Sequence, residues 1–149
     1  MSGYFFYLRM GCFMSGYSGT PLLKKLGIKP GHQVLVVNPP DSYLDWITPL
    51  PEEVVLKSKA GTTALDFIHL FATERKLFEK DLLRLRKSLK PNGMIWISWP
   101  KKASKVVTDM NEDVIRNFAL KNGLVDIKVC AVDEVWSGLK LVIPLKDRA

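Results

Sequence analysis

The sequence predicts one α/β domain with three layers: a mainly parallel, twisted sheet with helices on both faces and a C-terminal antiparallel strand pair. Three observations lead to this prediction. The runs 33–37 and 64–71 are rich in β-branched or apolar residues, and 94–99 lacks polar alternation, as a strand covered on both faces does. Helical patterns lie between strands, and this alternation favours a parallel sheet. The last two strands, 126–132 and 139–143, are separated by a short connection, which favours antiparallel pairing.

The first elements follow from turn and capping residues. Residues 1–14 are interpreted as an N-terminal extension, because Met-Ser-Gly-Tyr recurs at 14–17, and the domain is expected to cover 15–149. A short membrane or partner anchor is the alternative for the extension. Thr20 is the expected N-cap of a short helix that ends before Gly27. The strand 33–37 follows and is broken by two prolines.

The middle of the chain predicts a weak strand, a strong strand and a long helix. The weak strand is 53–57, and the strong one is the apolar run 64–71. Thr73 is the expected N-cap of a helix over 74–89. Its apolar residues recur at helical spacing and predict the buried stripe Phe78, Leu82, Leu85 and Leu89.

The strand 94–99 is expected to be central in the sheet, with a turn at Pro91-Asn92-Gly93 before it and a stop at Pro100. Asp109 and Glu112 have the spacing of a capping box, which predicts a helix that runs to Asn122. In open α/β sheets, ligands bind beyond the carboxyl ends of the strands. The residues that follow the central strand are therefore the first place to look for a site.

Composition bounds the function. The chain has 149 residues and a net charge of +7, and no apolar run approaches the roughly 20 residues of a membrane-spanning helix. Residues 72–105 hold ten bases and three acids, so they carry the whole imbalance and favour an anionic ligand or an acidic partner. Cys12 and Cys130 lack metal-type spacing, which is typical of free thiols in a reducing compartment, and we expect a cytoplasmic protein without a metal site.

Two stretches carry a resemblance to a known fold family. Leu26-Gly27-Ile28-Lys29-Pro30-Gly31-His32-Gln33-Val34-Leu35-Val36-Val37 and Leu89-Lys90-Pro91-Asn92-Gly93-Met94-Ile95-Trp96-Ile97 resemble the Rossmann-type fold of S-adenosylmethionine-dependent methyltransferases. The blocks at 16–22, 99–102 and 123–139 resemble more closely a small bacterial family of methyltransferase-like proteins. This second resemblance covers about residues 15–145 and implies the fold, with no particular activity.

The departures from the methyltransferase pattern concern the cofactor. A Gly-x-Gly-type loop is expected after the first strand, because glycine lets the backbone approach the cofactor closely. Asn38-Pro39-Pro40 stands there, and its two prolines remove two N–H donors. It also resembles the Asn-Pro-Pro-aromatic motif of amino-group methyltransferases, but Asp41 replaces the aromatic residue, and a rigid turn is the preferred interpretation. Lys57-Ser58-Lys59 stands where a ribose-binding acid is expected.

The predicted ligand site lies after the central strand. Ammonium and hydroxyl groups that can hold a phosphate or carboxylate come from Lys101, Lys102, Lys105, Ser98 and Ser104. Solvated loop lysines are the alternative. If the N-terminal segment folds over the sheet edge, aromatic and hydroxyl side chains line a pocket there, namely Tyr17, Ser18, Trp99, Trp136 and Ser137. Trp99 and Trp136 serve equally well as core aromatics.

The other candidates have structural explanations that we prefer. Helix capping accounts for Asp109 and Glu112 better than acid–base chemistry does. His69, inside an apolar strand, is expected to be a hydrogen-bonded core residue, and Cys130 a buried, inert thiol. His32 lies in a turn and is expected to be exposed. A basic stripe on the long helix is expected to be a solvated face, with nucleic acid as the alternative; it comprises Lys76, Lys80, Arg84 and Lys87.

The function expected from these residues is that of a methyltransferase-like domain without methyl transfer. It is expected to bind a small anionic molecule, or an acidic protein partner, at the edge formed by 99–105. A divergent S-adenosylmethionine-dependent methyltransferase is the first alternative, and a nucleic-acid-binding module that uses the helix 74–89 is the second. No resident cofactor is expected, and S-adenosylmethionine is the one that the resemblance leaves open.

Overall fold

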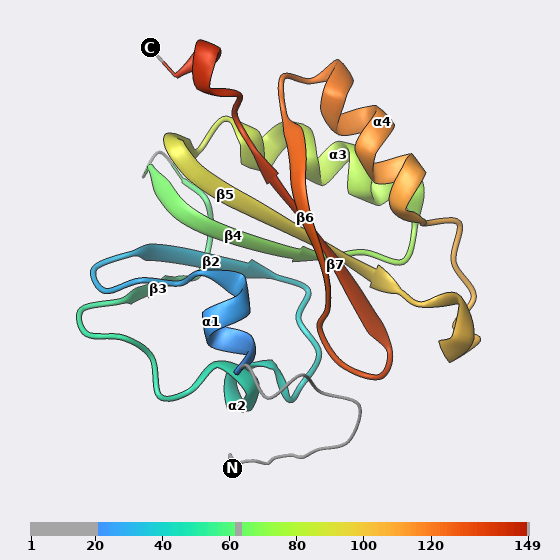
Figure 1. Cartoon of the computed structure of the whole chain (residues 1–149), viewed down its shortest axis with the longest axis horizontal. Coiled ribbons are helices and arrows are strands. Elements are labelled where there is room, and N and C mark those ends of the chain that lie inside the picture. Colours follow the sequence, from blue (N-terminus) through green and yellow to red (C-terminus); the bar gives the residue numbers. More distant parts are fainter. Residues whose placement is uncertain (1–20, 62–63, 149) are drawn as a thin grey trace.

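The computed structural model describes residues 21–61 and 64–148. They form a six-stranded sheet in the order β3-β2-β4-β5-β7-β6 (Figure 1). The first four strands in this order pair in parallel, and β7 pairs antiparallel with both β5 and β6. The predicted fold class is confirmed. The strands are β2 (Gln33–Val37), β3 (Val55–Lys57), β4 (Leu65–Phe71), β5 (Leu89–Pro100), β6 (Val125–Ala131) and β7 (Trp136–Val142).

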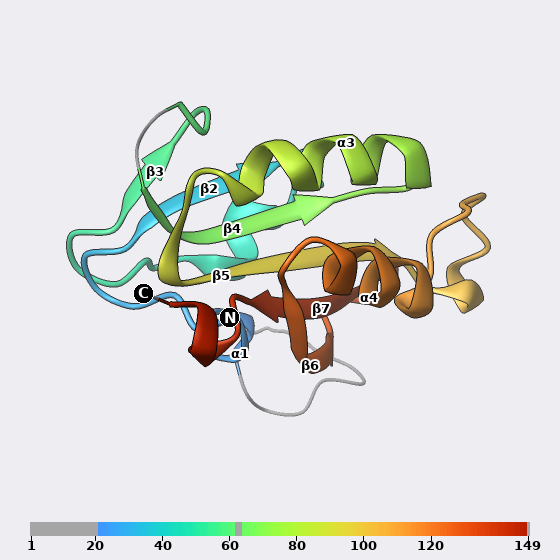
Figure 2. The ribbon, with the colours of Figure 1, turned by 90° about the horizontal axis from the view of Figure 1, so that it is seen from above.

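Helices cover both faces of the sheet. The short helices α1 (Leu22–Leu26) and α2 (Tyr43–Ile47) share one face with Phe67 and Phe71 of β4. The next residues of β4 alternate to the other face, where they pack against the longer helices α3 (Arg75–Arg86) and α4 (Glu112–Lys121). Figure 2 shows α3 alongside β4 and α4 alongside β7.

The helix α3 has its predicted buried stripe but different ends. Phe78, Leu82 and Leu85 are fully buried, whereas Leu89 already belongs to β5. The predicted N-cap Thr73 is wrong, because Glu74 occupies that position and makes no side-chain cap. The N–H of Arg75 instead donates to the Asp109 carboxylate at 2.6 Å. The cap therefore comes from a loop 34 residues away.

The strand β5 starts earlier than predicted. Leu65 pairs with Leu89 and Phe67 with Met94, so five positions of β5 lie opposite two of β4. The predicted turn at 91–93 is thus a bulge within a longer strand. A Cβ on Gly93 would lie 2.9 Å from the carbonyl oxygen of Leu65, which explains glycine at this position. Pro100 ends the strand as predicted.

The helix α1 is held by side chains from the sheet. Pro21 occupies its N-cap position, and the predicted cap Thr20 lies outside the described residues. Gly27 ends the helix in the left-handed conformation, with φ of 88°. The indole N–H of Trp96, a fully buried residue of β5, donates to the Leu26 carbonyl at 2.8 Å. This bond fixes the end of a helix that is too short to be stable alone.

The remaining elements are close to their predictions. The short strand β3 lies inside the predicted range 53–57. The N-cap of α4 lies two residues after the expected one. The Asn111 side chain, not that of Asp109, accepts from the N–H of Val114 at 2.9 Å. No helix within residues 21–61 and 64–148 has the length and apolar character needed to cross a membrane.

Candidate functional site

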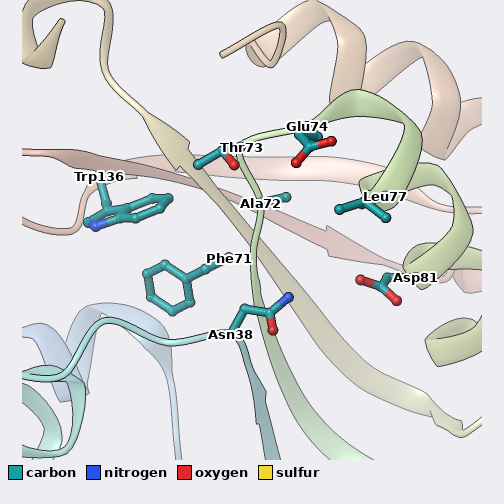
Figure 3. A pocket seen from close by; sticks show the side chains of 8 residues that line it. All are labelled: Asn38, Phe71, Ala72, Thr73, Glu74, Leu77, Asp81 and Trp136. Carbon is teal, nitrogen blue, oxygen red and sulfur yellow. The ribbon is translucent and has the colours of Figure 1, made fainter. Parts of the chain in front are cut away.

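A cavity of about 250 Å³ opens at the carboxyl ends of β2 and β4 (Figure 3). From β2 the chain continues to β3, toward one edge of the sheet, and from β4 it continues to β5, toward the other edge. The cavity thus lies at the point where the strand order reverses, which is where open α/β sheets bind ligands. Its lining residues are Asn38, Phe71, Ala72, Thr73, Glu74, Leu77, Asp81 and Trp136.

Three elements position this lining. Asn38 directly follows β2 with φ of 56°, a left-handed conformation that asparagine tolerates better than most residues. Phe71 ends β4, and Trp136 begins β7; their rings meet edge to face at a centroid distance of 5.1 Å. The segment between β4 and α3 is tied down by Thr108, whose hydroxyl donates to the Thr73 carbonyl at 2.5 Å.

The charged groups of the cavity are acidic. Glu74 and Asp81 both come from the α3 side, and the aromatic rings lie opposite them (Figure 3). Asp81 also accepts a bond from Arg84 at 3.2 Å, which offsets part of its charge. Carboxylates beside aromatic faces suit a ligand with amine or other donor groups. Sequence reasoning missed both acids as site residues, because only the strand order brings them beside Asn38.

Among the predicted site residues that the structure describes, Trp99 and Trp136 lie on opposite faces of the sheet. Tyr17 and Ser18 lie outside the described residues. Trp99 is 8% exposed and belongs to the core under α3 and α4, whereas Trp136 packs on the opposite face. The reason is the pairing of β5 with β7, which places Trp99 opposite Ser137. Within the described part of the chain, Trp136 is the one predicted residue that lines the cavity.

The lysine-bearing loop lies outside the cavity lining. Its short 3₁₀ helix, Lys102–Ser104, follows Lys101, whose N–H donates to the Val135 carbonyl at 2.7 Å. The Ser104 hydroxyl donates to the Lys101 carbonyl at 2.6 Å, so it holds the loop together. Lys101, Lys102 and Lys105 make no ion pair with any residue that the structure describes. The anion predicted here stays a prediction.

The prediction of a hydrogen-bonded core residue at His69 is confirmed. Its Nδ1 lies 2.8 Å from the Tyr43 hydroxyl, and its Nε2 lies 2.7 Å from the Ser98 hydroxyl. A neutral imidazole has one donor and one acceptor, so it satisfies both partners. Burial lowers the pKa of His69 to about 3 and raises the pKa of Tyr43. All three side chains are buried, so this trio has no access to a substrate.

The carboxylates proposed as caps are structural. Asp109 caps α3 rather than α4, as described above, and Glu112 forms an ion pair with Arg116. Arg116 also contacts Asp126 of β6 at 3.0 Å, which ties α4 to the sheet edge. Cys130 is half-buried, and burial raises the pKa of its thiol, as expected for an inert cysteine.

The basic stripe of the long helix faces the solvent. All four residues of the stripe are exposed on α3; they are Lys76, Lys80, Arg84 and Lys87. His32 is partly exposed, and its Nδ1 accepts from the Lys29 N–H at 3.1 Å.

Among residues 21–61 and 64–148, no group of three or more histidine, cysteine or acidic side chains is arranged to hold a metal ion.

Comparison with solved structures identifies the fold as methyltransferase-like. The chain is similar to an S-adenosylmethionine-dependent methyltransferase from Aquifex aeolicus, with a TM-score of 0.54 and 19% identity over 83% of this chain and 88% of that one. It is also similar to magnesium protoporphyrin IX methyltransferase from Synechocystis, solved with bound S-adenosylmethionine, with a TM-score of 0.57 and 10% identity over 83% and 74% of the two chains.

A third similar structure is fibrillarin from Aeropyrum pernix, solved with natively bound S-adenosylmethionine. The TM-score is 0.55, and 14% of residues are identical over 82% of this chain and 72% of that one. No family model and no curated protein matches the sequence. At these identities the comparisons show the fold alone.

The residues at the switch point depart from the pattern expected of an S-adenosylmethionine site. Pro39 and Pro40 remove two N–H donors from the loop after β2, and the Pro40 carbonyl accepts from the N–H of Tyr43 at 3.0 Å, at the start of α2. The strand β3 ends at Lys57, where a carboxylate would be needed to accept bonds from ribose hydroxyls.

Proposed function

We propose that the chain is a methyltransferase-like domain that does not transfer methyl groups and instead binds a small ligand, or a partner, at the carboxyl edge of its sheet. The observation that carries this proposal is the rigid Asn38-Pro39-Pro40 loop beside the cavity at the switch point. The three blocks that resemble a small bacterial family support membership in it, which is part of the proposal. A reducing, cytoplasmic environment is also part of the proposal, and the spacing of Cys12 and Cys130 supports it.

The size of the cavity supports a small ligand. About 250 Å³ lies below the roughly 300–1,000 Å³ of pockets for drug-sized molecules. Its lining combines the aromatic rings of Phe71 and Trp136 with the amide of Asn38 and two carboxylates. These groups favour a compact molecule that carries an amine, since an ammonium group can contact both a ring face and a carboxylate.

The anion predicted from the sequence suits a different part of the same edge. Carboxylates of Glu74 and Asp81 repel an anion from the cavity. An anionic molecule or acidic partner is therefore proposed for the lysine-bearing loop, where Lys101, Lys102 and Lys105 form no ion pair within the described residues. The acidic side chains of the cavity therefore favour an amine there, and the lysines of the loop favour an anion.

Two four-carbon probes test the cavity. Putrescine carries two amines, and succinate carries two carboxylates. We expect putrescine to shift the indole N–H signal of Trp136 in ¹H–¹⁵N spectra, with succinate leaving it in place. Asp81→Asn should weaken the response, and Glu79→Gln, on the same helix but outside the lining, should not. A response to succinate alone, or one that Asp81→Asn leaves intact, contradicts the proposed cavity chemistry.

A divergent methyltransferase is the second candidate. It is favoured by the fold shared with the Synechocystis and Aeropyrum structures, which were solved with bound S-adenosylmethionine. Thermal unfolding with and without S-adenosylmethionine separates the candidates, because a bound ligand stabilises the folded state by mass action. We expect no shift in melting temperature at micromolar cofactor, and a saturable rise there would replace the first proposal with the second.

A further inference from the structure

Four lysines gather where the end of α1 meets the outer strands of the sheet. Lys128 of β6 lies directly opposite Lys140 of β7 in the antiparallel pair, so both side chains leave the same face. The Nζ of Lys128 donates to the Lys25 carbonyl in α1 at 3.3 Å. A Cβ added to Gly27 would lie 3.9 Å from the Nζ of Lys140, which places that ammonium group beside the end of the helix.

The two strand lysines continue a row that crosses the sheet. His69 pairs with Trp96, Trp96 with Lys140, and Lys140 with Lys128, on neighbouring strands. The first two residues are fully buried, and the Trp96 indole is bonded to α1. The row therefore changes from a buried aromatic end to a charged end at the point where α1 stops covering the sheet.

In the described part of the chain, these charges have no ion-pair partner. Burial, and then the charges of Lys128 and Lys29, lower the pKa of Lys140. Within residues 21–61 and 64–148, no ion pair involves Lys25, Lys29, Lys128 or Lys140. Residues 1–20 contain no aspartate or glutamate that could supply a carboxylate side chain.

The arrangement costs stability in the absence of a ligand. Like charges directly opposite each other destabilise an antiparallel pair, and the half-buried position of Lys140 adds desolvation. The partial negative charge at the end of α1 attracts cations, and Lys128 already satisfies it through the Lys25 carbonyl. The end of α1 therefore accounts for the position of Lys128 alone. An external anion would account for the gathering of all four lysines.

We propose that Lys25, Lys29, Lys128 and Lys140 form a binding site for a small multivalent anion, either free phosphate or the phosphate group of a small molecule. Lysine binds phosphate as a point charge with three donors, and a doubly charged anion would relieve the repulsion between the paired strand lysines. The site belongs to β6, β7 and α1, so it is separate from the acidic cavity and does not depend on the proposed function.

Thermal unfolding at constant ionic strength tests the site with inorganic phosphate and pyrophosphate as probes and chloride as the reference salt. At ten times the dissociation constant, we expect the wild-type melting temperature to rise by about 3–6 °C. Lys140→Met keeps the length and apolar stem of the side chain and should abolish the rise. Lys121→Met, on exposed α4, is the matched control and should retain it.

Four results would overturn the inference. The first is no saturable rise with either probe up to 10 mM, on the order of the weakest useful affinities. The second is an equal rise in wild type and Lys140→Met, since excluded anions stabilise any protein without a site. The third is a tighter response to a short DNA duplex than to pyrophosphate, which would indicate a polyanion. A Lys140→Met melting temperature in chloride equal to or above wild type supports the inference, and a large fall contradicts it.

Discussion

The buried histidine makes the stability of this fold depend on pH. The pKa of His69 is about 3 in the folded protein, against 6.5 when it is not buried, because desolvation disfavours the imidazolium. The unfolded chain therefore binds a proton that the folded protein does not, at any pH between these values. The resulting stabilisation is complete above pH 6.5 and is lost as the pH falls from 6.5 toward 3.

The size of the loss follows from the two pKa values. Each pKa unit corresponds to about 1.4 kcal/mol, so this group alone lowers the free energy of unfolding by about 2 kcal/mol between pH 7 and pH 5. At pH 4 the loss reaches about 3 kcal/mol.

Urea unfolding at pH 7 and pH 5 measures this difference directly. His69→Gln is the informative variant, because a glutamine amide can both donate and accept between Tyr43 and Ser98 but cannot titrate. The variant is expected to be less stable at pH 7, since it loses the ring stacked on Phe71 at 4.3 Å, and to have a much smaller change with pH. His32→Gln removes the partly exposed histidine and should keep the wild-type change. Equal losses in wild type and His69→Gln would refute the reasoning.

Three further predictions test single contacts and one surface. Gly93→Ala should lower the melting temperature, because its Cβ would meet the Leu65 carbonyl oxygen at 2.9 Å, and an unchanged melting temperature would contradict this explanation of the glycine. Asp109→Ala should cost about 1 kcal/mol in urea unfolding by removing the cap on the Arg75 N–H, and an unchanged midpoint would contradict that role. If α3 binds nucleic acid, duplex binding should weaken steeply with salt and disappear when its exposed bases are neutralised together, at Lys76, Lys80 and Arg84.

The fold was predictable because its signals are local. The apolar run at 33–37 is the strand β2 without a change of bounds, and the helical spacing of Phe78, Leu82 and Leu85 gives the buried face of α3. Capping was less predictable, since the donor at Arg75 is satisfied from 34 residues away. A local sequence pattern indicates where a helix forms. It does not indicate which distant loop supplies the side chain that caps the helix.

The candidate site was predictable only as an edge of the sheet. Its lining depends on β2 lying beside β4, a strand order that brings Asn38 next to Phe71 and that no local pattern specifies. The pairing of Pro100 with Trp136 likewise sends Trp99 and Trp136 to opposite faces. A shift of one residue in that register would have put both on one side, and no local pattern sets the register.

The attachment of α1 implies an order of assembly. This helix leaves the ribosome before any strand of the sheet, yet its carbonyls are bonded by Trp96, 70 residues later, and by Lys128, 103 residues after Lys25. A five-residue helix has no stability of its own. Among the elements that the structure describes, the first to be synthesised therefore has no stable structure until β5 has emerged, and nascent chains that stop before Trp96 would leave the end of α1 unattached to the sheet.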